Sequence, residues 1–436
     1  MRSARLAAAG VLVAVALVTP ARPADELPRA DARRLEARVL ALGRFGANAE
    51  GGVTRVAFGP ADVDGRAYVS SLMRAVGLAV RIDAAGNILG RRQGRETGLP
   101  VILFGSHIDS VPGGGNYDGV AGVLGAIECV ELLNAAVRTT RHPLEVVVFA
   151  DEEGSLAGSR AMADALGEEA LAETSHSGLT VREGIRAIGG DPERLASARR
   201  RPSELRAFLE LHVEQGGILD AKGLDIGVVL GIVGINWWDV TVEGIANHAG
   251  TTPMDRRKDA LVAAAQLVLA VNRVVTAVPG SQVGTVGRIA AAPGAPNVIP
   301  GRVEMSLELR DLSAGKIAAL FAAVEAEART IAATTGTRIS FRPVDATALP
   351  ALTDERIRRL IAAAADALGL RHTALPSGAG HDAQDLARVT PTGMVFVPSA
   401  GGISHSPKEY TSPEQVARGV DVLLRTILAI DAGALD

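Results

Sequence analysis

Two apolar segments that lead into clusters of polar, ionisable residues constrain the fold of this chain most strongly. Residues 101–107 read VILFGSH and continue into a glycine-rich loop with two aspartates, Asp109 and Asp118. Residues 144–150 read LEVVVFA and are followed at once by DEEG. Short apolar runs of this kind are typical of strands buried on both faces. Parallel strands end at one edge of a sheet, where open α/β folds bind their ligands. We therefore predict an α/β fold with a polar site at that edge.

A segment in the middle of the chain follows a different pattern, in which apolar and polar residues alternate. Residues 238–243 (WDVTVE) and 302–310 (RVEMSLELR) are typical of antiparallel strands with one face in solvent. A long helix is expected between them, with Thr252 as its N-cap, and a second long helix at 313–333. These elements predict a compact unit in which helices cover one face of an antiparallel sheet.

The length of the chain, 436 residues, exceeds that of one ordinary domain. A pattern typical of buried strands returns at 394–397, so the alternating unit is inserted. We predict a larger domain with a mostly parallel central sheet over 25–218 and 336–436, and a smaller α+β domain over 219–335. A formal charge of −4 gives no basic surface for nucleic acid, and a single cysteine excludes a disulfide within the chain.

The first residues have the features of an export signal. Residues 1–5 (MRSAR) are basic, and residues 6–18 form an apolar run too short to span a bilayer comfortably. Ala21 or Ala24 supplies a small residue for cleavage. We predict a signal peptide over residues 1–24 and export to a bacterial periplasm. The alternative is an uncleaved amphipathic helix. We expect no membrane span later in the chain.

Five histidine and carboxylate side chains are expected at strand ends or in loops of the larger domain. They are His107, Asp118, Glu153, His212 and His405. Imidazole and carboxylate ligands without thiolate suit a divalent metal such as zinc, manganese or cobalt. Five ligands are too many for one zinc ion with an open position, but they fit two ions that share a bridging carboxylate, for which Asp118 is the natural candidate. Each residue taken alone would be an ordinary polar loop residue.

Three neighbours of these ligands have expected roles. Asp109, two residues after His107, is placed to accept the second imidazole N–H and fix its tautomer. Glu152 is placed to act as general base on a metal-bound water and then to protonate a leaving nitrogen, although it could instead be a surface carboxylate. His381, in the sequence GHDA, is open between a supporting role at the site and a role at a helix start.

Eight motifs between residues 105 and 411 carry a resemblance to a known family. They are GSHIDSVPGGGNYDG, DEEGS, ELHVEQG, NHAGTTPMDRRKDA, GAPNVIPG, SLELRD, SGAGHDA and GISHSPKEYT. The chain resembles the dinuclear-zinc amidohydrolases related to aminoacylase and to carboxypeptidase-type peptidases. More narrowly, it is similar to the branch of N-carbamoyl-L-amino acid hydrolases, allantoate amidohydrolases and β-ureidopropionases. The resemblance implies a zinc-peptidase-like catalytic domain with an inserted lid domain that also forms a homodimer interface.

The resemblance further implies how the ligands divide between two metal ions. His107 and His212 would bind one ion, Glu153 and His405 the other, and Asp118 would bridge them. The ions would be zinc, or manganese, cobalt or nickel. A histidine at position 212 is typical of the carbamoylase branch, whereas peptidase relatives tend to have a carboxylate there.

Four further residues match positions that contact the substrate in this branch. They are Gln215, His248, Asn297 and Arg310. Arg310 is expected to grip a substrate carboxylate in a bidentate pair, the alternative being an ion pair with Glu308 or Glu304 on its own strand. His248 is expected to act in catalysis by donating a hydrogen bond to the oxyanion, from the lid of the same subunit or of its partner.

The predicted function is hydrolysis of a linear C–N bond in a small substrate that bears a carboxylate, most directly an N-carbamoyl-L-amino acid or a ureido acid. A dipeptidase or N-acyl amino acid deacylase on the same scaffold is the first alternative, and a non-catalytic binding protein is the second. One departure from the family follows Glu153. Residues 154–160 read GSLAGSR, whereas relatives usually continue with Arg-Phe after EEGS and have a longer segment.

Overall fold

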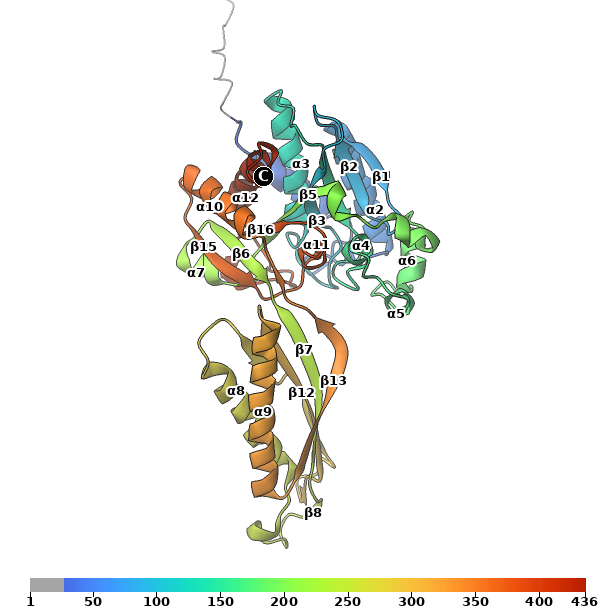
Figure 1. Cartoon of the computed structure of the whole chain (residues 1–436). Helices are drawn as coiled ribbons and strands as arrows, with labels where there is room; N and C mark the ends of the chain where they lie inside the picture. The colour runs from blue at the N-terminus through green and yellow to red at the C-terminus, as the bar shows by residue number, and fades with distance from the viewer. Residues whose placement is uncertain (1–26) are drawn as a thin grey trace, which may run out of the picture.

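The structure, a computed structural model, describes residues 27–436, without the side chains of residues 345–347. The predicted signal peptide, residues 1–24, lies outside the described residues. Two units follow one another along the long axis of the molecule in Figure 1, each with its own sheet and apolar core. In the described part of the chain, no helix is both long enough and apolar enough to cross a membrane.

The larger unit is built on one mixed sheet of nine strands, in the order β1-β2-β4-β3-β5-β16-β6-β14, with β15 also paired to β6. β3 runs parallel to β4 and β5, and β5 runs parallel to β16, so these central strands end at the same edge. This confirms the predicted α/β fold with a mostly parallel central sheet. The strands are β1 (Ala79–Ile82), β2 (Ile88–Arg92), β3 (Val101–His107), β4 (Leu144–Phe149), β5 (Leu205–Val213), β6 (Ile226–Ile232), β14 (Ala351–Leu352), β15 (His372–Ser377) and β16 (Thr392–Val397).

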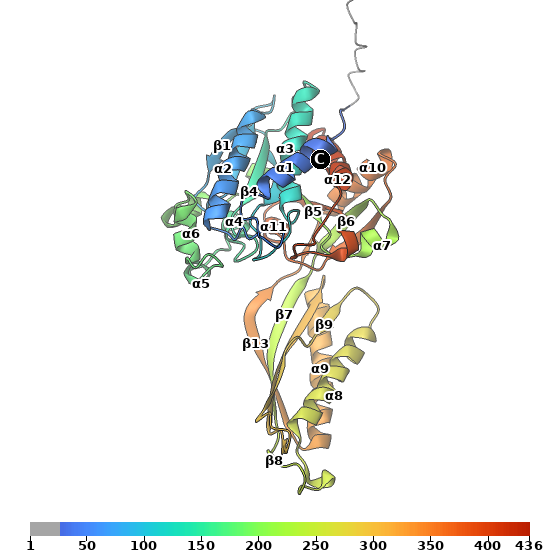
Figure 2. The same ribbon diagram turned by 180° about the vertical axis from the view of Figure 1, so that it is seen from behind.

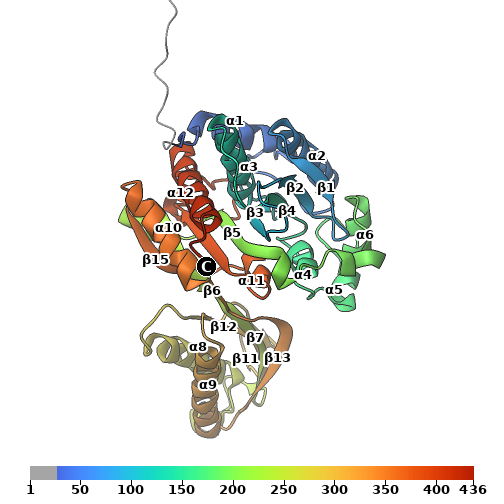
Figure 3. The ribbon, with the colours of Figure 1, turned by 45° about the horizontal axis from the view of Figure 1, so that its top comes forward.

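Helices pack on both faces of this sheet (Figure 3). Ile102 and Phe104 of β3 share one apolar core with α1, α2, α3, α10 and α12, whereas Val101 and Leu103 share another with α4 and α11. Successive side chains of a strand point to opposite faces, so the continuous apolar run in β3 is explained by burial on both sides. The helices are α1 (Ala32–Leu42), α2 (Pro60–Ala75), α3 (Val120–Ala135), α4 (Ala157–Met162), α5 (Glu168–Ala172), α6 (Val181–Ala187), α7 (Ile218–Lys222), α10 (Glu355–Ala367), α11 (Asp382–Leu386) and α12 (Pro413–Asp431).

The smaller unit is an antiparallel sheet in the order β10-β12-β7-β13, with β9 also paired to β12. Its apolar face, which includes Val240 and Leu307, packs on two long helices, so the predicted alternation is confirmed. β8 and β11 form a separate two-stranded pair. The elements are β7 (Gly234–Glu243), β8 (Asn247–His248), α8 (Ala260–Thr276), β9 (Val283–Thr285), β10 (Ile289–Ala292), β11 (Val298–Ile299), β12 (Arg302–Asp311), α9 (Ala314–Thr335) and β13 (Arg338–Ala348).

Strand pairing places the smaller unit later in the chain than the predicted range of 219–335. β6 pairs with β15 and β16 in the large sheet, although it lies inside that range. β13 pairs with β7 in the small sheet, although it lies beyond the range. The elements of the small sheet therefore run from Gly234 to Ala348. The neighbouring strand decides to which unit β6 and β13 belong. The pattern of residues along the chain does not show which strand that neighbour is.

The start of the first long helix in the smaller unit also differs from its prediction. The Thr252 hydroxyl donates to His248 O at 2.7 Å, and Thr252 lies eight residues before the first residue of the long helix. α8 begins at Ala260 instead, and the Asp259 carboxylate accepts the N–H groups of the first turn. Thr252 and Asp259 are both residue types that favour the N-cap position, and Asp259 is the one that caps α8.

Candidate metal centre

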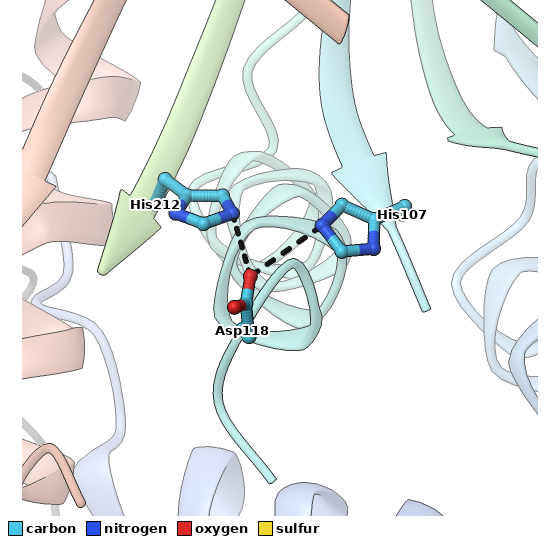
Figure 4. Close-up of side chains that lie close together, drawn as sticks. All are labelled: His107, Asp118 and His212. Carbon is cyan, nitrogen blue, oxygen red and sulfur yellow. Dashed lines mark ion pairs between the residues drawn. The ribbon is translucent and has the colours of Figure 1, made fainter. Parts of the chain in front are cut away.

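The five predicted ligands converge at the carboxyl edge of the large sheet. His107 is the last residue of β3, and His212 is next to last in β5. Asp118 lies two residues before α3 and points between the two rings, as Figure 4 shows. Its Oδ1 is 3.1 Å from His212 Nε2 and 3.6 Å from His107 Nε2. The imidazoles of two neighbouring strands thus face the same oxygen of Asp118.

The other oxygen of Asp118 belongs to a second cluster. Asp118 Oδ2 is 3.3 Å from His405 Nε2, and His405 Nε2 is 3.5 Å from Glu153 Oε2. In each group of three residues, the potential ligand atoms all lie within 4.8 Å of one another. Asp118 is the member that the two groups share, with one oxygen toward each.

Backbone carbonyls hold both buried imidazoles in the tautomer that a metal ligand needs. His107 Nδ1 is 3.1 Å from Asp109 O, and His212 Nδ1 is 2.9 Å from Val213 O. Because a carbonyl only accepts, each Nδ1 carries a proton, which leaves Nε2 as the nitrogen through which the neutral ring can bind a metal ion. Nε2 faces Asp118 in both rings.

Asp109 supports the site in a different way from the one predicted. Its carboxylate was expected to accept the N–H of His107, but the nearer acceptor is the backbone carbonyl of Asp109, because Oδ1 is 3.6 Å from His107 Nδ1. The carboxylate instead accepts the backbone N–H of Glu153 at 3.0 Å, and that of Glu152 at 3.4 Å. Asp109 therefore connects His107 to the turn that carries both glutamates.

The charges of the centre fit a divalent cation. Burial, and then the charge of Asp118, raises the pKa of the Glu153 carboxyl to about 7. The hydrogen bond to Asp118 raises the pKa of His405 to about 9. His107 Nε2 and Glu153 Oε1 are buried without a hydrogen-bond partner among the described residues. Bound cations reverse such shifts and use such atoms as ligands, so the residues present fit metal ions.

A cavity of about 180 Å³ opens beside the two clusters. Glu152 lines it, and its Oε2 is 3.4 Å from His107 Nε2. Burial raises the pKa of Glu152 well above its ordinary value. The lining residues are Asp118, Glu152, Glu153, Gly154, Leu156, Gln215, Ala379, Gly380, His381 and His405.

His381 is a site residue that the sequence left undecided. It occupies the N-cap position of α11, but its side chain does not cap the helix. Its ring lies edge-on to His212 with centroids 4.5 Å apart, and its Nε2 is 2.8 Å from Ser377 Oγ. Burial, and then the charge of His212, holds the pKa of His381 well below its ordinary value, so the ring is neutral. The short GHDA sequence was the only signal for it.

Two predicted substrate residues lie at or near the cavity. Gln215 lines it, and its Nε2 donates to Asp118 Oδ2 at 2.7 Å. Arg310 pairs with Glu308 at 2.8 Å, which was the alternative expected from the sequence, and its Nη1 also donates to Gly378 O at 2.7 Å. Arg310 thus lies at the junction of the two units, next to the segment that forms one cavity wall.

The other two predicted substrate residues are far from the metal ligands. His248 lies in β8 and pairs with Val298 of β11, beside Asn297. Figures 1 and 2 show β8 at the end of the smaller unit, away from the ends of β3 and β5. The structure therefore does not bring His248 or Asn297 into the site of the same chain. His248 Nδ1 accepts from Gly250 N at 3.0 Å, which leaves Nε2 to carry the proton of the neutral ring, and the residue is exposed.

Comparison with known proteins agrees with this architecture. The model of peptidase family M20/M25/M40 matches residues 103–429. An N-carbamoyl-L-amino acid amidohydrolase of Geobacillus stearothermophilus is 42% identical over 405 residues, which cover 92% of this chain and 98% of the relative. A ureidoglycolate hydrolase of Arabidopsis thaliana is 39% identical over 414 residues, which cover 91% and 86%.

A solved structure supports the same assignment. An amidase of the hydantoinase/carbamoylase family from Burkholderia multivorans has 36% sequence identity and a TM-score of 0.85, over 92% of this chain and 98% of its own. Sequence and structure thus agree over nearly the whole described chain, including both units. The chain belongs to peptidase family M20/M25/M40, in the branch that contains the N-carbamoyl-L-amino acid amidohydrolases.

Proposed function

We propose that this protein hydrolyses a linear C–N bond in an N-carbamoyl-L-amino acid or a related ureido acid. The observation that carries the proposal is the position of Asp118, whose two oxygens face different ligand clusters beside Glu152 in one cavity. The relatives that align over 92% and 91% of the chain are an N-carbamoyl-L-amino acid amidohydrolase and a ureidoglycolate hydrolase.

The centre would hold two divalent ions, either zinc or one of manganese, cobalt and nickel. His107 and His212 would bind one ion, Glu153 and His405 the other, and Asp118 would bridge them. When bound, the ions supply Lewis acidity toward the carbamoyl group of the substrate. The carbonyls on Nδ1 of the two buried imidazoles support this assignment, since they leave Nε2, which faces Asp118, as the nitrogen through which neutral imidazole binds metal.

Glu152 would move the proton during the reaction. It lies in the cavity on the turn that follows β4, and the backbone of that turn is held by Asp109. In this position it would take a proton from the attacking water and deliver it to the leaving nitrogen. One C–N bond of the ureido group then breaks, which releases one nitrogen as an amine and leaves the other on a carbamate. Loss of carbon dioxide from that carbamate breaks the second C–N bond, so the products are the free amino acid, carbon dioxide and ammonia.

The smaller unit, as a lid, would complete the substrate site. Arg310 would bind the substrate carboxylate, because it already lies at the junction of the two units, and Gln215 would contact the substrate from the cavity wall. His248 and Asn297 lie together at the far tip of the lid. We therefore propose a homodimer in which they enter the site of the partner subunit. The free Nε2–H of His248 suits donation to an oxyanion.

The test is release of ammonia by purified protein that lacks residues 1–24 and has been loaded with Mn²⁺ or Zn²⁺. The panel contains N-carbamoyl amino acids of both hands, allantoate, ureidoglycolate, N-acetyl amino acids and dipeptides. We expect ammonia and free amino acid from an N-carbamoyl-L-amino acid, or ammonia from a ureido acid. Cleavage of dipeptides or N-acetyl amino acids without any ammonia-releasing activity would refute the proposal and establish the alternative on the same scaffold.

We also propose that the protein is exported and that residues 1–24 are removed. The support is the sequence alone, a basic start followed by a short apolar run and small residues. Mass spectrometry of the protein from its native host should find a first residue after Ala21 or Ala24, in the periplasmic fraction. A cytoplasmic protein that begins at Met1 or Arg2 would refute export.

A further inference from the structure

Glu409 is a buried carboxylate that touches the loops of both ligand clusters. It lies four residues after His405, in the segment between β16 and α12, and is 5% exposed. Its Oε1 accepts the backbone N–H groups of Tyr117 and Asp118, at 2.8 and 3.0 Å. Its Oε2 accepts the hydroxyl of Ser404 at 2.8 Å. One side chain therefore binds the residue before His405 and the backbone of Asp118 itself.

These contacts join two segments that are far apart in the chain. Asp118 comes from the loop between β3 and α3, and His405 from the loop before α12. Ser404 Oγ also lies 3.2 Å from Asp118 Oδ2, so the hydroxyl is positioned between the two carboxylates. The distance between Asp118 and His405 thus depends on a chain of short polar contacts that passes through Glu409.

The surrounding backbone leaves little freedom for this arrangement. His405 has a φ of 50°, in the left-handed region that residues other than glycine adopt only when their surroundings hold them. At Gly115 an added Cβ would overlap the Glu409 carboxyl group, so Glu409 packs directly on the loop that carries Asp118. A residue with this packing can set a position without touching the ion.

We propose that Glu409 is a positioning residue that sets the gap between Asp118 and His405 and thereby favours binding of the second metal ion. The inference rests on the two-ion centre proposed above. Glu409 acts on the ion held by Glu153 and His405, because its bond to Ser404 ties the loop of His405 to Asp118. The ion held by His107 and His212 should depend on it less, since their rings are fixed by the carbonyls of Asp109 and Val213.

The test is calorimetric titration of the metal-free protein with Zn²⁺, for the wild type and for four variants. Wild type should take up two ions in separate steps. Glu409→Ala should weaken the second step by about 10–100-fold, the usual effect of removing a partner of a metal ligand, and leave the first unchanged. Glu409→Gln keeps an oxygen for the two N–H groups and an amide for Ser404, so it should lose less. Glu414→Ala, at an exposed position nearby, is the control.

Ser404→Ala gives a second, smaller perturbation if Glu409→Ala fails to fold, because it removes the contacts of the Ser404 hydroxyl with Glu409 and Asp118 and keeps the bonds from Glu409 to the backbone of Tyr117 and Asp118. It should also weaken the second step selectively, and the melting temperature of each metal-free variant reports folding. The inference would be overturned if Glu409→Ala bound both ions with wild-type affinity. If Glu409→Ala does not fold, the same result in Ser404→Ala would overturn it. An equal loss at both steps would also overturn it. Uptake of a single ion by wild type would refute the two-ion proposal, and is read from the wild-type titration alone.

Discussion

Single atoms decide what each residue of the centre can do. His107 and His212 present Nε2 because a backbone carbonyl engages Nδ1 in each ring. Asp118 presents one oxygen to each cluster. Glu152 differs from these three because it belongs to neither cluster, although its Oε2 lies 3.4 Å from His107 Nε2. Metal binding and proton transfer should therefore be separable by mutation.

Asp118→Ala and Glu152→Gln should fail in different ways. Asp118→Ala removes a ligand from both clusters, so it should lose bound metal together with activity. Glu152→Gln should keep its metal content and lose about 10²–10⁴ in kcat, as expected for loss of a general base. Elemental analysis of the dialysed proteins and measurement of kcat distinguish the two. Two ions per chain in Asp118→Ala would contradict the bridging role.

Among the elements, α3 positions Asp118 because it packs on the central strands at very short range. Gly122, in its first turn, lies against the backbone carbonyl of Leu211 in β5 and the side chain of Ser106 in β3. An added Cβ at Gly122 would overlap that carbonyl, which is backbone and cannot rotate away. The helix that follows Asp118 is thus held against β3 and β5, the two strands that carry His107 and His212 near their carboxyl ends.

Gly122→Ala should destabilise the protein although alanine favours helix. The clash should cost about 1–3 kcal/mol, typical of overpacking in a close-packed core. The matched control is Gly315→Ala in α9, an exposed position with space for a methyl group, where the same change should stabilise by about 0.5–1 kcal/mol. Chemical denaturation of both variants gives the two values. A Gly122→Ala variant as stable as wild type would show that α3 can shift on the sheet.

At the scale of the whole molecule, one chain places its predicted groups at two distant locations. The metal ligands lie at the edge of the large sheet, and His248 and Asn297 lie at the tip of the lid. The exposed face of α8 carries Leu261, Val262 and Leu269, which suits contact with a second lid. These positions support the proposed homodimer, in which each tip reaches the partner's metal centre.

Complementation between two inactive variants tests the proposed exchange of residues. His248→Ala and Glu152→Gln should each be nearly inactive alone. In a mixed dimer, one centre would combine an intact Glu152 with His248 of the partner subunit. After unfolding and refolding of an equal mixture, activity should therefore recover to about a quarter of wild type. Absence of recovery, with mixed dimers shown by mass spectrometry, would contradict the exchange.

The sequence alone was sufficient for features that depend on local pattern and residue chemistry. The apolar runs before His107 and before Glu152 predicted buried parallel strands, since burial on both faces requires continuous apolar residues. Parallel strands end at one edge, so the same pattern predicted that their polar ends would meet. The mixture of imidazole and carboxylate, without thiolate, then indicated a divalent metal. The inserted antiparallel unit followed from its alternation.

Only the tertiary structure decided which groups face one another. The predicted domain boundaries assigned β6 to the smaller unit and β13 to the larger one, and the structure shows the reverse. A strand belongs to the sheet in which its neighbour lies, and that neighbour can be far away in the chain. Likewise, nothing near Glu409 in the sequence indicates that it binds the backbone of Asp118, and nothing near His381 indicates that its ring lies edge-on to His212. Hydrogen bonds and ring contacts act over a few ångströms of space, so they are set by how the elements pack and not by their order along the chain.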